Sequence, residues 1–180
     1  MPRLFVAVWP PADVLEQLAE VARPHVDGLR WTKPEHWHVT LRFVGAVPDV
    51  EPVVAALSAM PTPGPARAVL GPAVDRFGQR ILHVPVAGLE PVAEAVVAAT
   101  AHLGKPPDDR PFHGHVTLAR VAKHGRVDLR PLTGAAVHGE WQVDDVCLVE
   151  SRLSPNGARY EVLERFGLAR PVSPSADSGG

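Results

Sequence analysis

The sequence contains a single cysteine, Cys147, in a chain of 180 residues. One cysteine excludes an internal disulfide and any metal site built from several thiolates. Cys147 lies in an apolar stretch typical of a strand, with no basic helix start beside it in the sequence. We therefore expect a buried, unreactive thiol.

Long hydrophobic runs are also missing. No stretch approaches the roughly 18 to 20 apolar residues that cross a bilayer. The apolar start at residues 4–9 is cut off by Pro10 and Pro11, which makes it too short for the core of a signal peptide. These absences predict a cytoplasmic protein with no membrane partner.

An excess of positive charge is absent as well, since 18 basic residues face 20 acidic ones and the net charge is −2. This balance argues against broad binding to a nucleic-acid backbone. A local basic pocket remains compatible with it. Fifteen of the basic residues are arginines, whose guanidinium groups bind phosphate oxygens in pairs.

The remaining composition, 46% hydrophobic and 21% charged, is that of a globular domain. Strand patterns occur at residues 2–9, 29–31, 38–44, 67–70, 73–77, 80–86, 115–121, 140–153 and 158–166, and helical patterns at residues 12–23, 49–60 and 89–103. This order favours an α+β fold with antiparallel strands over alternating βαβ units. We expect one domain over residues 1–170 and a disordered tail over residues 171–180.

One tetrapeptide, His-Val-Thr-Leu, occurs twice, at residues 38–41 and 115–118. Both copies lie in expected strands, where side chains alternate between the two faces. The histidine and threonine of each copy therefore share one face, while the valine and leucine point to the other. If the two strands lie side by side or face each other, His38, Thr40, His115 and Thr117 converge on one small volume.

Two imidazoles and two hydroxyls in one place suit phosphate ester chemistry. A neutral imidazole can take a proton from water while a protonated one supplies a proton to the leaving oxygen. Threonine hydroxyls can donate to the non-bridging phosphate oxygens as charge develops on them. Such a site requires no metal and no cofactor.

The sequence resembles the 2H phosphoesterase superfamily and, within it, the bacterial and archaeal RNA 2′,3′-cyclic phosphodiesterases, often labelled 2′-5′ RNA ligases. The resemblance rests on both motifs and on residues 3–7, 34–41, 110–120 and 151–160, which follow the family landmarks in order. It implies two pseudo-symmetric α+β lobes with antiparallel sheets, a central cleft lined by the motifs, and helices on the outside.

The same resemblance implies the reaction and the roles of the residues. A 2′,3′-cyclic phosphate is opened to a 2′-phosphate, with His38 as the acid for the 3′ oxygen and His115 as the base for water. Thr40 and Thr117 bind phosphate oxygens. By this resemblance we expect the substrates to be RNA ends, short oligonucleotides or nucleoside 2′,3′-cyclic phosphates. We also expect a monomer, with 2′-5′ ligation as the reverse reaction.

Two further residues occupy family positions five places after each histidine. Arg120 would add a charged contact to phosphate, and Phe43 would stack on the nucleobase. Strict alternation puts Arg120 on the face opposite His115, so its role requires a bulge or the end of the strand. Core packing of Phe43 is an equally open reading.

Other readings of the same residues stay open. His36 and His113 each precede a motif histidine by two residues, so His-x-His pairs could hold Zn²⁺ or Fe²⁺. A module that binds a nucleotide or RNA end without turnover is a third hypothesis. Trp31 and Phe112 are weaker stacking candidates, and Arg67, Arg76 and Arg80 are interpreted as solvated charges at strand edges.

Overall fold

The computed structural model describes residues 1–154 and 157–168. Its strands are β1 (Arg3–Val8), β2 (Leu29–Trp31), β3 (Val39–Ala46), β4 (Ala66–Leu70), β5 (Asp75–Phe77), β6 (Ile81–Ala87), β7 (His115–Val121), β8 (Gly139–Val143), β9 (Asp145–Ser154) and β10 (Gly157–Gly167). Its helices are α1 (Ala12–Ala19), α2 (Glu51–Ser58) and α3 (Glu90–Thr100), with short 3₁₀ turns at Pro34–His36 and Arg130–Leu132. The tail expected at residues 171–180 lies outside the described residues.

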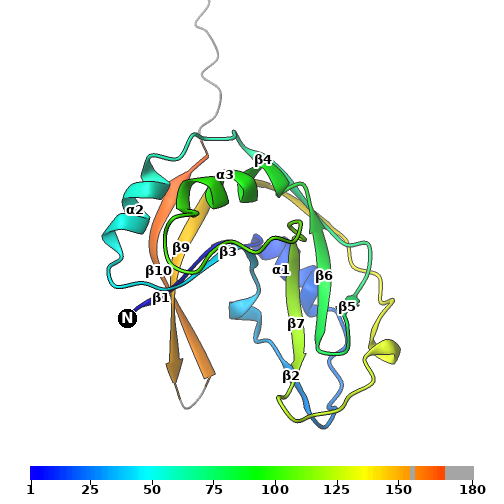
Figure 1. Ribbon diagram of the computed structural model, residues 1–180. Helices are drawn as coiled ribbons and strands as arrows, with labels where there is room; N and C mark the ends of the chain where they lie inside the picture. Colours follow the sequence, from blue (N-terminus) through cyan, green and yellow to red (C-terminus); the bar gives the residue numbers. More distant parts are fainter. Residues whose placement is uncertain (155–156, 169–180) are drawn as a thin grey trace, which may run out of the picture.

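The strands form one sheet in the order β10-β9-β1-β3-β7-β6-β4-β8, with β2 paired to β7 and β5 paired to β6. All of these pairs are antiparallel. Figure 1 shows the sheet curling into an arch, with β9 and β10 in one limb and β5, β6 and β7 in the other. The α+β fold with antiparallel sheets, predicted from the sequence, is confirmed.

The two halves of the sheet meet at one pair of residues. Val39 of β3 pairs with Val116 of β7, and these are the central valines of the two His-Val-Thr-Leu motifs. The sheets expected for two lobes are therefore joined edge to edge into a single curled sheet. This junction sets the two motifs beside each other.

The main apolar core lies on one face of the sheet and includes both valines, Val39 and Val116, which are fully buried. All three helices contribute to it, through Val14, Leu18, Val53, Leu57, Val92, Ala93 and Val96. The helices therefore cover the face opposite the motif histidines. No described helix is long and apolar enough to span a membrane.

Several element boundaries differ from the sequence expectation; the helix expected over residues 12–23, for example, ends at Ala19. The strand expected over residues 140–153 is two strands, because β8 pairs with β4 whereas β9 pairs with β1 at the other side of the sheet. Asp144 lies at the break between them. The helix expected over residues 49–60 is α2, which begins later, after Val50 as its N-cap residue.

A buried arginine fastens α3 to the sheet. Arg42 of β3 is 5% exposed, and its Nη2 donates to the carbonyl oxygens of Thr100, Leu103 and Lys105 at 3.0, 3.1 and 3.0 Å. These carbonyls belong to the end of α3 and the segment after it, where helix carbonyls lack partners. The guanidinium thus caps the helix and holds it against the strand that carries the first motif.

We expect Arg42→Met to lower the free energy of unfolding by about 2 to 4 kcal/mol, because three buried or partly buried carbonyl groups lose a charged donor. Urea unfolding followed by circular dichroism would measure the loss. Arg67→Met is the matched control, since Arg67 forms an exposed ion pair with Glu140 and its loss should cost less than about 1 kcal/mol. Equal losses in the two variants would contradict this role of Arg42.

Candidate active site

The two motifs share one face of the sheet. Val39 and Val116 are directly opposite in an antiparallel pair, so one step along each strand sets His38 opposite Thr117 and Thr40 opposite His115. Side chains opposite each other project to the same face. The four residues expected from the sequence are therefore brought together, on what is called here the motif face.

A backbone carbonyl fixes the orientation of each motif histidine. Nδ1 of His38 lies 2.7 Å from the carbonyl oxygen of His36, and Nδ1 of His115 lies 2.7 Å from that of His113. A carbonyl only accepts, so Nδ1 carries the hydrogen in both rings. Nε2 is then the nitrogen that can take or give a proton. In His38 it lies 3.1 Å from Oγ1 of Thr40.

Gly114 lets the second motif strand approach its neighbour. The Val86 amide donates to the Gly114 carbonyl oxygen at 2.8 Å. A Cβ at Gly114 would lie 2.3 Å from the carbonyl oxygen of Val86, well inside van der Waals contact. Glycine therefore permits β6 and β7 to pack closely at the residue immediately before His115.

Each motif ends in a β-bulge at its leucine. Along the β1–β3 pair the register runs from Val6 opposite Arg42 to Ala7 opposite Thr40, which leaves Leu41 as an extra residue. Along the β6–β7 pair it runs from Leu82 opposite Ala119 to His83 opposite Thr117, which leaves Leu118 as an extra residue. The extra residue shifts the alternation of side chains by one in both strands.

The bulges bring Phe43 and Arg120 to the motif face. Both side chains are exposed, whereas the residues before and after them are buried. The Arg120 guanidinium is near enough to both motif histidines that its charge contributes to lowering their pKa values. The sequence indicated that Arg120 could share a face with His115 only if its strand contained a bulge or ended there, and β7 contains such a bulge.

Aromatic side chains enclose His38. The rings of Phe5 and Trp9 lie 5.1 Å from its ring, and that of Tyr160 lies 5.4 Å away at an interplanar angle of 89°. Burial among these rings lowers the pKa of His38 to about 4; the hydrogen bond to the His36 carbonyl opposes this shift, and the nearby charges of Arg120 and other histidines add to it. His38 is therefore neutral at pH 7 in the substrate-free protein.

A third histidine stands beside His115. His83 of β6 is opposite Thr117, so it lies on the motif face, and its ring is 5.5 Å from that of His115. Phe77 stacks on His83 at 3.8 Å and meets His115 edge-on at 4.8 Å. Burial lowers the pKa of His115, and it lowers that of His83 to about 4.

The residues that surround His38 and His115 were not predicted from the sequence, although the alternation of side chains along their strands could have indicated some of them. Phe5, Ala7 and Trp9 alternate in the first strand and share one face with Thr40. His83 alternates with Ile81 and Pro85 in the same way. Which of the two faces of each strand carries the site depends on pairing between distant segments, and the sequence alone does not give that pairing.

The weaker candidates lie elsewhere. Trp31 packs against the main core and donates from Nε1 to the carbonyl oxygen of Pro24. Phe112 also packs against the core. The His36 ring lies against Tyr160, 4.7 Å between centroids. Within residues 1–154 and 157–168 no three histidine, cysteine or acidic side chains gather closely enough to hold a metal ion.

The Cys147 side chain lies on the same face of the sheet as Ala7, its partner in the β1–β9 pair. It belongs to a second apolar cluster formed by Phe5, Ala7, Cys147 and Val149, with Trp9 and Tyr160 packed against it. The thiol is fully buried, and burial raises its pKa. The expectation of a buried, unreactive cysteine agrees with both observations.

A curled antiparallel sheet with paired His-x-Thr strands on one face is the architecture of a two-histidine phosphoesterase. Residues 8–68 and 84–160 match the family model described as LigT like phosphoesterase, and the chain belongs to this family. The resemblance noted from the motifs is thereby confirmed, as is the prediction that the chain is an enzyme of the phosphoesterase class.

Relatives of known structure or curated name support the same family. An RNA 2′,3′-cyclic phosphodiesterase of Thermus thermophilus is 32% identical, with 92% of this chain and 90% of the relative covered. One of Escherichia coli is 26% identical, with 93% and 97% covered. The crystal structure of the protein TT0787 from Thermus thermophilus matches with a TM-score of 0.74 at 33% identity, over 92% of this chain and 97% of that one.

We expect the free energy of unfolding to fall as the pH is lowered from 7 to 5. His38 and His83 have folded-state pKa values of about 4 against an ordinary 6.5, so in this range the unfolded chain binds protons that the folded chain does not. Each histidine should contribute a loss of about 1 to 2 kcal/mol. His83→Phe should remove one such contribution, measured by urea unfolding at both pH values. An unchanged pH dependence in this variant would contradict the account.

Proposed function

We propose that this protein hydrolyses the 2′,3′-cyclic phosphate at RNA ends to a 2′-phosphate without a metal ion. The observation that carries the proposal is the placement of two histidines on one face of adjacent strands, each with Nδ1 held by a carbonyl. Curated relatives over more than nine-tenths of the chain bear the name RNA 2′,3′-cyclic phosphodiesterase, which supports the same substrate.

The proposed reaction is an in-line displacement at phosphorus. A water oxygen forms a bond to phosphorus, its proton passes to Nε2 of His115, and the bond from phosphorus to the 3′ oxygen breaks. Protonated His38 gives its Nε2 proton to the departing 3′ oxygen, so the product carries a 2′-phosphate and a 3′-hydroxyl. The family resemblance assigns these two roles.

Without substrate, the surroundings of His38 and His115 disfavour the protonated form of both rings. Burial and the Arg120 charge lower the pKa values of both histidines. A bound cyclic phosphate brings a negative charge within reach of both rings, which favours their protonated forms and raises these pKa values. Substrate binding itself would thus supply the condition under which one histidine holds a proton.

Three side chains are proposed to bind the phosphate and one the base. Thr40 and Thr117 flank the histidines and would donate to the non-bridging oxygens. Arg120 would add a charge-assisted contact. Phe43 is 62% exposed on the motif face, with its ring 6.1 Å from that of Phe5, and would stack on the nucleobase.

Replacing water by a ribose 5′-hydroxyl would give 2′-5′ ligation with the same residues. The 5′ oxygen would form the bond to phosphorus, His115 would accept its proton, and the 3′ oxygen would leave as in hydrolysis. All of these groups come from one chain, so the proposed site needs no second copy of the protein.

Two rival functions make different demands. A His-x-His metal enzyme needs His36 and His38 to share an ion, but the His36 ring packs on Tyr160, and among the described residues no three histidine, cysteine or acidic side chains gather closely enough to hold one. A module that binds without turnover has no need of two titratable groups in matching positions. The geometry favours catalysis by the imidazoles themselves.

Replacing either His38 or His115 by alanine should lower the hydrolysis of 2′,3′-cyclic AMP by about 10² to 10⁴, because an acid or a base is lost. The assay separates 2′-AMP from 3′-AMP in excess EDTA, with exposed His102→Ala as the matched control. Formation of 2′-AMP by the unmodified protein and by the control is expected. Near-normal rates in the His38 and His115 variants would overturn the proposal, and activity that requires added Zn²⁺ or Fe²⁺ would restore the metal hypothesis.

The pH profile of kcat/KM should be a bell with its maximum below pH 6.5, because it reports the free enzyme, in which both pKa values are lowered. The form of the enzyme with one protonated and one neutral motif histidine is most populated at a pH between the pKa values of His38 and His115. The profile of kcat should lie at higher pH, since bound phosphate raises both. Rates of 2′,3′-cyclic AMP hydrolysis from pH 4.5 to 9 test this, and a flat kcat/KM profile would count against two-histidine chemistry.

A further inference from the structure

Arg30 of β2 lies directly opposite Arg120 of β7. The flanking pairs, Leu29 with Val121 and Trp31 with Ala119, involve side chains that pack on the core side. Arg30 therefore projects to the opposite side of the sheet, which is the motif face. Beyond the bulge of β7, Arg120 and its cross-strand partner Arg30 therefore lie next to each other on this face.

This pair is unfavourable in the protein by itself. Like charges directly opposite each other in an antiparallel pair repel, and both side chains are exposed. Within residues 1–154 and 157–168 neither arginine forms an ion pair or a side-chain hydrogen bond. The sheet therefore maintains a charge arrangement that an anion would stabilise.

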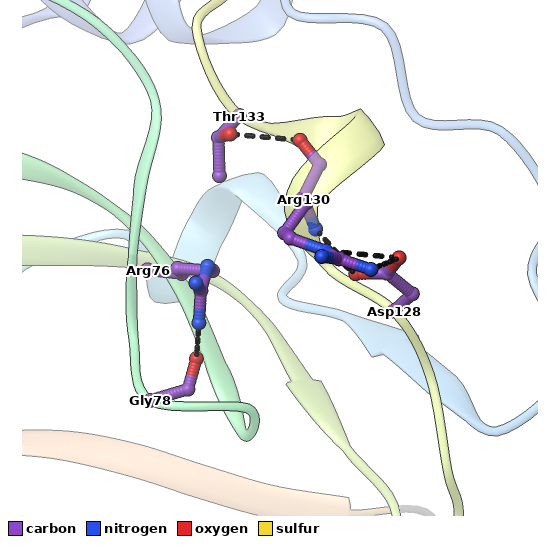
Figure 2. Close-up of polar contacts among 5 residues, drawn as sticks. All are labelled: Arg76, Gly78, Asp128, Arg130 and Thr133. Carbon is purple, nitrogen blue, oxygen red and sulfur yellow. Dashed lines mark hydrogen bonds and ion pairs between the residues drawn. The ribbon is translucent and has the colours of Figure 1, made fainter.

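Neighbouring arginines behave differently. Arg76 donates to the carbonyl oxygen of Gly78, and Arg130 pairs with Asp128 through both carboxylate oxygens, as Figure 2 shows. Arg80 donates to the carbonyl oxygens of Val121 and Lys123 at 3.4 Å. Their donors are already engaged within the protein, whereas those of Arg30 and Arg120 stay available to a ligand.

We propose that Arg30 binds the phosphodiester on the 5′ side of the terminal nucleotide, so that the enzyme prefers RNA of two or more nucleotides to a mononucleotide. This inference rests on the proposed function. Arg120 is assigned to the reacting phosphate, and the backbone of Arg30 lies one strand beyond that of Arg120, about 5 Å away. A second guanidinium at that offset suits the next negative charge of the chain.

The test compares two substrates, 2′,3′-cyclic AMP and the dinucleotide ApA with a terminal 2′,3′-cyclic phosphate. Arg30→Gln should lower the ratio of kcat/KM for the dinucleotide over that for the mononucleotide about tenfold, the effect of one lost charge-assisted contact. Arg67→Gln makes the same charge change on β4, two strands away from β7, where Arg67 is paired with Glu140, and should keep the ratio. Arg30→Lys should restore most of it.

Salt dependence provides a second measurement. Calorimetric titration with ApA 2′-phosphate at several salt concentrations gives the slope of log K against log salt. Each phosphate contact to a single strand contributes about 0.7 to this slope, so Arg30→Gln should reduce its magnitude by about that amount. Relief of the repulsion from Arg120 predicts that the thermal midpoint of Arg30→Gln does not fall.

Each other result overturns the inference. An equal loss on both substrates would place Arg30 at the reacting phosphate, and unchanged ratio and slope would show that it touches neither. If the unmodified protein hydrolyses neither substrate, the proposed function fails. The salt slope of dinucleotide binding then still decides whether Arg30 contacts the second phosphate.

Discussion

Val39 pairs with Val116 where β3 meets β7, and this backbone contact sets the two motifs side by side on one face of the sheet. It lets the valines enter the core beneath the helices while the histidines and threonines project together on the other face. A shift of one residue in either strand would reverse that arrangement, because side chains alternate. Burial of the valines therefore fixes the register, and the register fixes the chemistry. The stability of the core and the proposed function would therefore depend on the same pair of residues.

The surroundings of the two motif histidines are related but unequal. His38 lies among Phe5, Trp9 and Tyr160, whereas His115 adjoins Phe77 and a third imidazole, that of His83. Burial disfavours the charged form in both places, and one more positive charge, on Arg120, adds to this effect. The site thus discourages cations when empty and becomes suited to them when an anion occupies it. In the proposed reaction, this charge balance would couple substrate binding to the protonation of one histidine.

Much of the fold and part of the site follow from local patterns. Alternation placed His38 with Thr40 and His115 with Thr117, and the spacing of turns predicted antiparallel pairing. The bulges at Leu41 and Leu118 did not follow, because a bulge depends on the register of the partner strand. For the same reason the split between β8 and β9 was not predicted, since they pair with strands at different ends of the sheet. His83 was missed because a single histidine in an apolar strand becomes informative only when its neighbour across the sheet is known.

Strand β1 lies between β3 and β9, so the first strand of the chain is completed by one of the last. During synthesis the first motif is made early. The apolar cluster that contains Phe5 also requires Cys147 and Val149, and Tyr160 is one of the aromatic rings that pack around His38. A nascent chain therefore exposes Phe5 and an unpaired edge of β1 until β9 has been made. Contacts of such long range slow folding, and chains in this condition are vulnerable to aggregation. His38, the motif histidine that is synthesised first, therefore acquires its complete surroundings only after β9 and β10 have been made.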